Sequence, residues 1–89
     1  MTSRTTARFR EALAQLPAHV QRQARDAYKQ FIQNPGHPSL RFKPVHATRP
    51  IYTARVSRDY RAVGIIDREV IVWFWIGSHA NYERLLSQL

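Results

Sequence analysis

The chain has 89 residues, enough for one small domain and too few for two. It contains no cysteine, which excludes disulfides and thiolate metal sites, and its longest apolar run, Val70 to Ile76, is too short to span a bilayer as a helix. The 14 Lys and Arg residues against 6 Asp and Glu give a net charge of +8. Most of these cations are arginine, which favours an anionic partner, with nucleic acid first and an acidic protein second. The N-terminal segment has no apolar signal core, so we expect a cytoplasmic protein.

Residues 5–33 have the spacing of two amphipathic helices. In the first helix, one face carries the apolar residues Phe9, Ala12, Leu13 and Leu16. Pro17 then interrupts the pattern and can occupy the first turn of a second helix, which ends at the Asn-Pro-Gly sequence of residues 34–36. This part of the chain therefore predicts a helical hairpin with two apolar stripes.

The remainder of the chain has the alternating period of strands. We expect strands at 40–45, 51–57, 60–66 and 69–76, joined in the second half by turns at Arg58–Asp59 and Asp67–Arg68. The last strand is apolar at both parities, which predicts a central strand covered on both faces. A short helix from about Ala80 closes the chain. The predicted fold class is α+β, with an N-terminal helical hairpin packed on a mainly antiparallel four-stranded sheet and a short C-terminal helix.

Four basic residues lie on the polar parity of different strands or strand starts, namely Arg41, Lys43, Arg55 and Arg61. If these parities share one side of the sheet, that face cannot pack on apolar helices without a large desolvation cost. It must then face water or bind an anion. Four independent solubilising charges are the alternative interpretation.

His79 directly follows the predicted central strand, where a rigid backbone can hold a functional group in place. Histidine can give or take a proton near neutral pH, and arginines can stabilise the charge on a phosphate. The acidic residues show no metal-ligand spacing, and no glycine-rich loop for nucleotide phosphates is present. These side chains fit RNA cleavage without a metal. From the pattern alone, a structural turn histidine remains the alternative for His79, and core packing for Tyr82.

Three segments that follow the helical hairpin, "SLRFKPV", "YTARVSRDYRAVG" and "IVWFWIGSHANYERLL", resemble the RelE/ParE superfamily of bacterial toxins from toxin–antitoxin pairs. The resemblance covers nearly the whole chain as a single domain, residues 1–89, and its most specific parts are "DYRAVG" and "WIGSHANYERLL". It implies a RelE-like fold that opens with a strand, for which "MTSRTTARF" is a short, polar candidate.

In the RelE-like branch, the resemblance implies an endoribonuclease that cuts mRNA in the ribosomal A site, without cofactor or metal, and that is bound by an acidic antitoxin. The catalytic residues it implies are Arg61, His79, Arg55 and Tyr82, and the RNA-binding residues are Arg41, Lys43, His46 and Arg58. No carboxylate stands out as a general base, so His46 or a ribosomal group is expected to substitute. The ParE-like branch shares the fold but poisons DNA gyrase, so the fold leaves open a gyrase inhibitor or an inactive homologue.

Overall fold

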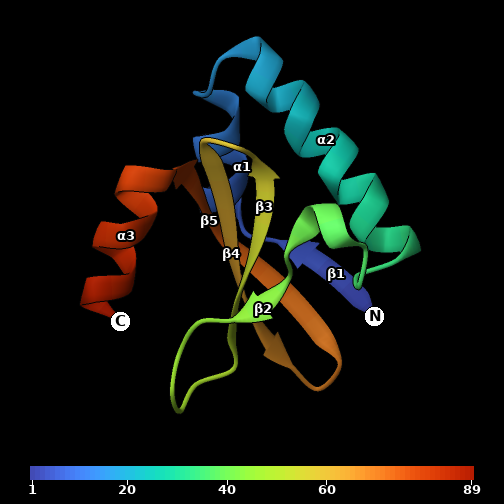
Figure 1. The fold of residues 1–89 in the computed structure, drawn as a ribbon, viewed down its shortest axis with the longest axis vertical. Helices are drawn as coiled ribbons and strands as arrows, with labels where there is room; N and C mark the ends of the chain where they lie inside the picture. Colours follow the sequence, from blue (N-terminus) through green and yellow to red (C-terminus); the bar gives the residue numbers. More distant parts are fainter.

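The computed structural model describes residues 1–89 as a five-stranded sheet with helices on both faces (Figure 1). The strands are β1 (Thr2–Thr5), β2 (Lys43–Pro44), β3 (Ile51–Ser57), β4 (Tyr60–Asp67) and β5 (Val70–Ser78). The helices are α1 (Ala7–Ala14), α2 (Ala18–Gln33), the short 3-10 helix η1 (Pro38–Leu40) and α3 (His79–Gln88). The strand order is β1-β5-β4-β3-β2, with β1 parallel to β5 and the other pairs antiparallel. None of the helices has the length and apolar character needed to cross a membrane.

The α1–α2 hairpin forms as the sequence predicts. Helix α1 begins after Thr6, whose Oγ1 accepts a hydrogen bond from the Phe9 N–H at 3.0 Å. Pro17 separates the two helices and caps α2 without a side-chain hydrogen bond. The apolar stripes of both helices pack on one face of the sheet, in a cluster that includes Phe9, Ala24, Phe31, Ala54, Ala62 and Trp73. The hairpin therefore covers one face of the sheet with apolar side chains.

Strand β5 is an interior strand between β1 and β4, next to the edge of the sheet and not at its centre, and it is covered on both faces, as its composition predicts. It pairs with β4 along its length and with β1 through Val70–Trp73. Ile71 and Trp73 belong to the cluster beneath the hairpin, whereas Trp75 packs with Val63 in a second cluster beneath α3. Both faces of β5 are thus covered, which explains why it is apolar at both parities.

The sheet has one strand more than the four that the pattern of residues 40–76 predicts. The polar candidate near the N-terminus forms β1, with Thr2 opposite Val70 and Thr5 opposite Trp73. The indole N–H of Trp73 also donates to Ser3 Oγ at 3.1 Å. An edge strand is held largely by backbone hydrogen bonds, which depend little on residue type, so the sequence signal for this strand is weak.

The strand predicted at 40–45 is shorter than expected, and only Lys43–Pro44 pairs with β3. The preceding residues Pro38–Leu40 form η1, and Arg41 follows with φ 45° and ψ 41°. This left-handed backbone interrupts the extended chain, so the pairing begins only at Lys43, opposite Thr53. The predicted start of this strand is therefore wrong.

The β4–β5 hairpin turns through Arg68 and Glu69, one residue later than the predicted Asp67–Arg68 turn. Both turn residues have positive φ, 51° and 69°. Two successive positive φ angles match the right-handed twist of paired strands and are usually supplied by Asn or Gly. Because neither residue type is present, the exact turn position carries little signal in the sequence.

Gly64 is buried on β4, beside a bulge in the β4–β5 pairing. A Cβ here would lie 2.9 Å from Trp73 Cε3 and 3.0 Å from the Val72 carbonyl oxygen. Because the backbone cannot move aside cheaply, we expect Gly64→Ala to lower the free energy of unfolding by about 1–3 kcal/mol. Gly36→Ala is the control, since its Cβ would meet only Asn34 Oδ1 at 3.4 Å. Denaturant titration of both variants tests this, and equal stabilities would contradict the packing argument.

Candidate active site

Two arginines lie opposite each other on neighbouring strands. Arg55 of β3 pairs with Arg61 of β4, and Arg61 pairs in turn with Gly77 of β5. Directly opposed residues project from the same face of a sheet. The adjacent residues Ala54 and Ala62 face the helical hairpin, so Arg55 and Arg61 project from the other face, on the side of α3. The predicted shared basic face therefore exists for these two strands.

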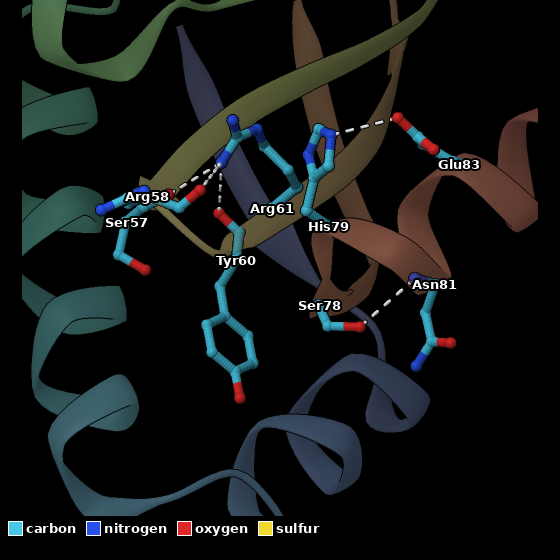
Figure 2. A network of polar contacts seen from close by, with 8 residues as sticks. All are labelled: Ser57, Arg58, Tyr60, Arg61, Ser78, His79, Asn81 and Glu83. Carbon is cyan, nitrogen blue, oxygen red and sulfur yellow. Dashed lines mark hydrogen bonds and ion pairs between the residues drawn. The ribbon is translucent and has the colours of Figure 1, made fainter.

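Arg61 is held by the turn that joins β3 to β4 (Figure 2). Its Nη1 donates to the backbone carbonyls of Ser57 at 2.7 Å, Tyr60 at 3.0 Å and Arg58 at 3.3 Å. No carboxylate forms an ion pair with Arg61, and its Nε and Nη2 make no hydrogen bond within the protein. The side chain is thus fixed at one nitrogen, while its charge and its other donors remain available to an anion.

The surroundings of Arg61 lower its pKa. Partial burial is the largest cause, and the positive charge of Arg55 is the next. Arg41 acts in the same direction, whereas Tyr82 and Asp59 act in the opposite one. A guanidinium remains charged at neutral pH even so, because its ordinary pKa is very high. No carboxylate forms an ion pair with Arg61, so a bound phosphate would offset the repulsion between Arg55 and Arg61.

His79 is the first residue of α3, directly after the end of β5. The helix is capped by Ser78, whose Oγ accepts the Asn81 N–H at 3.2 Å. The backbone N–H of His79 donates to the Asp59 carbonyl at 2.8 Å, which ties the start of α3 to the β3–β4 turn. This is the same turn that holds Arg61, and Figure 2 shows both side chains projecting from this end of the sheet. The fold therefore brings His79 and Arg61 to one region.

The imidazole of His79 has two neighbours on its own helix. Its Nε2 lies 3.2 Å from Glu83 Oε1, one helical turn further on, and its ring centroid lies 5.8 Å from that of Tyr82. The His79 side chain is 48% exposed, so a substrate can reach it. Glu83 is absent from the residues predicted to form the site. The signal that could have indicated it is the i, i+4 spacing from His79 within the last helix.

Tyr82 is a packing residue that also borders the site. It is 7% exposed and belongs to the buried cluster with Ile51 and Val63. The ring centroids of Tyr82 and Trp75 are 6.5 Å apart. The Trp75 ring in turn lies against Gly77, where a Cβ would be only 2.8 Å from the indole. Gly77 thereby leaves room for an aromatic side chain next to Arg61. Tyr82 and Trp75 form an apolar support under the polar groups.

The remaining predicted cations lie around this site. Lys43 projects from the same face as Arg55, because its partner in β3 lies two residues before Arg55. Arg41 is exposed and close enough for its charge to affect Arg61. Arg58 is exposed in the β3–β4 turn and contacts Arg61 through its carbonyl. These three residues extend the positive region around the two central arginines.

His46 lies apart from the other predicted residues, in the loop before β3 and thus at the opposite end of that strand from Arg55. Its Nδ1 accepts the N–H groups of Thr48 at 3.2 Å and Arg49 at 3.0 Å, and its Nε2 lies 3.1 Å from the Leu89 carbonyl oxygen. Both ring nitrogens are therefore occupied within the protein. The structure does not bring His46 to Arg61, and its contacts organise the loop.

The arrangement of Arg55, Arg61 and His79 is able to bind a phosphate and to transfer a proton beside it. No three His, Cys, Asp or Glu side chains are grouped as ligands for a metal ion.

Residues 18–84 match the family model of the ParE-like toxin domain. This match covers well over half of the chain, and the chain therefore belongs to the family of ParE-like toxin domains. It confirms the expected membership of the RelE/ParE superfamily. No curated protein matches the chain.

Solved structures share the fold. The RelB–RelE antitoxin–toxin complex from Methanococcus jannaschii contains a chain with a TM-score of 0.74 and 12% identity, covering 92% of this chain and 96% of that one. The RelBE2 toxin–antitoxin complex from Mycobacterium tuberculosis gives a TM-score of 0.69 and 23% identity, with 88% and 96% covered. YafQ from E. coli gives 0.62 and 13%, with 90% and 94% covered. The expected RelE-like α+β fold is confirmed.

The contacts of His46 predict a local effect of its removal. We expect His46→Ala to speed amide hydrogen exchange at Thr48 and Arg49, because each N–H loses an acceptor worth about 1 kcal/mol. Exchange followed by NMR measures the two amides directly. His19→Ala is the control, since His19 is exposed at the start of α2 and has no hydrogen bond from its ring. Unchanged exchange at both amides would contradict a structural role for His46.

Proposed function

We propose that the protein is the toxin of a toxin–antitoxin pair and that it inhibits translation as a ribosome-dependent mRNA endoribonuclease. The observation that carries the proposal is the placement of Arg55, Arg61 and His79 at one end of the sheet, on the face that carries α3. The family match supports a toxin, and the likeness to RelE and YafQ supports an RNA target. Neither arginine is neutralised by a carboxylate, which suits a site for a phosphodiester.

The proposed reaction uses the substrate's own ribose as the nucleophile. The 2′-oxygen loses its proton to a base and attacks the adjacent phosphorus, while the bond from phosphorus to the 5′-oxygen breaks and that oxygen takes up a proton. The products are a 2′,3′-cyclic phosphate and a 5′-hydroxyl end. His79 transfers a proton in this sequence, and Arg61 with Arg55 stabilises the additional negative charge on the phosphoryl oxygens. No cofactor or metal enters these steps, and the ribosomal A site would hold the mRNA in line for attack.

Substitution of the two central groups tests the site. We expect Arg61→Ala and His79→Ala each to reduce cleavage of ribosome-bound mRNA by roughly a hundredfold or more and to remove growth arrest, since each loses a group that acts in the transition state. Arg22→Ala, an exposed arginine on α2, is the control and should cleave normally. Circular dichroism shows whether the variants fold. If both folded variants remain fully toxic, the catalytic assignment is wrong.

Inhibition of DNA gyrase is the competing function within this superfamily, and an inactive homologue is the other. Mapping of mRNA 5′ ends after induction separates the three. Cuts in frame within translated regions support the nuclease, whereas intact mRNA with DNA damage signalling supports gyrase inhibition. Intact mRNA without growth arrest supports an inactive homologue.

The proposed partner of the toxin is an acidic antitoxin. A groove of about 430 Å³ lies between α1 and α2, and its apolar lining is formed by Phe9, Leu13, Ala24 and Tyr28. Every charged residue that lines it is a cation, namely Arg10, Arg25 and Lys29. An amphipathic segment with acidic residues beside its apolar ones would match this groove in both polarity and charge. The RelE structures that share the fold were solved as complexes with RelB antitoxins.

Reversal of charge along this groove tests the partner. We expect the double variant Arg25→Glu and Lys29→Glu to weaken binding of the neighbouring gene's acidic product by at least tenfold, because attraction becomes repulsion. Titration calorimetry at two salt concentrations measures the affinity and its electrostatic part. The matched control is Arg68→Glu in the β4–β5 turn, away from the groove. Equal affinities for both variants would place the antitoxin elsewhere.

A further inference from the structure

Glu83 is the carboxylate that contacts the histidine of the candidate site, although the chain is rich in arginine. The protein has two ion pairs, Asp67 with Arg68 in the exposed β4–β5 turn and Glu83 with His79. Arg84 follows Glu83 in the chain but forms no ion pair with it. The Glu83 side chain therefore pairs with the one residue of α3 that has a proton-transfer role in the proposed function.

The chemistry of this contact selects one tautomer of the imidazole. Glu83 Oε1 lies 3.2 Å from His79 Nε2 as an ion-pair contact, and because a carboxylate can only accept hydrogen bonds, this contact favours a hydrogen on Nε2. In the neutral ring, the lone pair is then on Nδ1. Figure 2 shows the imidazole between Glu83 on one side and Arg61 on the other. The unprotonated nitrogen is thereby left for the side of the ring where a phosphodiester bound to Arg61 would lie.

Two further contacts restrict movement of the His79 side chain. The His79 backbone N–H is bonded to the Asp59 carbonyl at 2.8 Å, so the first residue of α3 cannot shift away from the β3–β4 turn. The imidazole also rests against the ring of Tyr82, at a centroid distance of 5.8 Å, and Tyr82 is itself buried. Glu83 adds the restraint that these two contacts lack, because it distinguishes one ring nitrogen from the other.

We propose that Glu83 is a positioning residue that holds His79 in the Nε2–H tautomer, so that Nδ1 accepts the proton of the attacking ribose 2′-hydroxyl. This inference rests on the proposed nuclease function of the same site. As the proton moves from the 2′-oxygen to Nδ1, the ring becomes an imidazolium and the Glu83 carboxylate stabilises the new charge. The 2′-oxygen forms its bond to phosphorus, and the departing 5′-oxygen takes a proton from water.

The first test needs no RNA and measures the tautomer itself. The ¹⁵N chemical shifts of the His79 ring, recorded above the pH at which the imidazole becomes neutral, should show Nε2 protonated and Nδ1 unprotonated in the wild type. Glu83→Ala should give a mixture of tautomers, whereas Glu83→Gln, which keeps an acceptor oxygen, should retain the wild-type preference. Glu11→Ala is the control, because Glu11 is an exposed carboxylate on α1 without an ion pair. The same ring shifts in Glu83→Ala as in the wild type would overturn the proposal.

The second test measures catalysis on ribosome-bound mRNA. Under single-turnover conditions, Glu83→Ala should cleave about tenfold more slowly than the wild type, whereas the RNA concentration for half-maximal rate should change less than twofold. Glu83→Gln should recover most of the rate. A wild-type rate in Glu83→Ala, or a loss confined to RNA affinity, would overturn the positioning role. If the wild type fails to cleave, the nuclease function falls, and a tautomer shift in Glu83→Ala would still support Glu83 as the residue that orients His79.

Discussion

The pairing of Arg61 with Gly77 across β4 and β5 is the constraint on which the rest of the site depends. Strand β5 is covered by α1 on one face and by α3 on the other, so a slip of one residue would exchange its buried side chains between two different clusters. The register is therefore fixed by packing. The β3–β4 register places Arg55 beside Arg61, and α3 begins near them, because it starts directly where β5 ends. The apolar strand β5 thus determines where Arg61 and His79 lie, although neither residue belongs to it.

The electrostatics of the site depend on two facts: Arg61 has no carboxylate partner, and its hydrogen bonds go to neutral carbonyl groups. Arg61 donates to three carbonyls of one turn, and these neutral groups orient it without cancelling its charge. Partial burial and the positive charge of Arg55 lower its pKa. Clusters of like charge that are retained against this cost are characteristic of sites that bind an opposite charge. The single nearby glutamate is directed to the histidine and leaves the cationic surface intact.

The parts of the fold that the sequence predicts well are those whose periodicity is enforced by burial. The helical hairpin, β3, β4 and β5 all bury a stripe or a face, and their residues show it. Strand β1 is only a weak candidate in the sequence and the start of β2 is misplaced, because backbone pairing and the left-handed turn at Arg41 place few demands on side-chain type. Within the site, parity indicates that Arg55 and Arg61 could share one face, and the β3–β4 register shows that they do. The distance of His46 from them depends on loop geometry that no local pattern encodes. The contact of Glu83 with His79 follows from their i, i+4 spacing only when the last helix is known to begin at His79.

The parallel pairing of β1 with β5 has a consequence for the order of folding. Strand β1 is joined to α1 by a single residue, yet its partners are Val70–Trp73, far along the chain. This pairing closes the longest loop in the domain, whereas the β3–β4 and β4–β5 hairpins need only short turns. The three-stranded meander can therefore form first and present the β5 edge as a template. Docking of β1 carries the largest loop-closure cost of the sheet, and before β1 is paired the edge of the most apolar strand offers unpaired backbone groups to other chains.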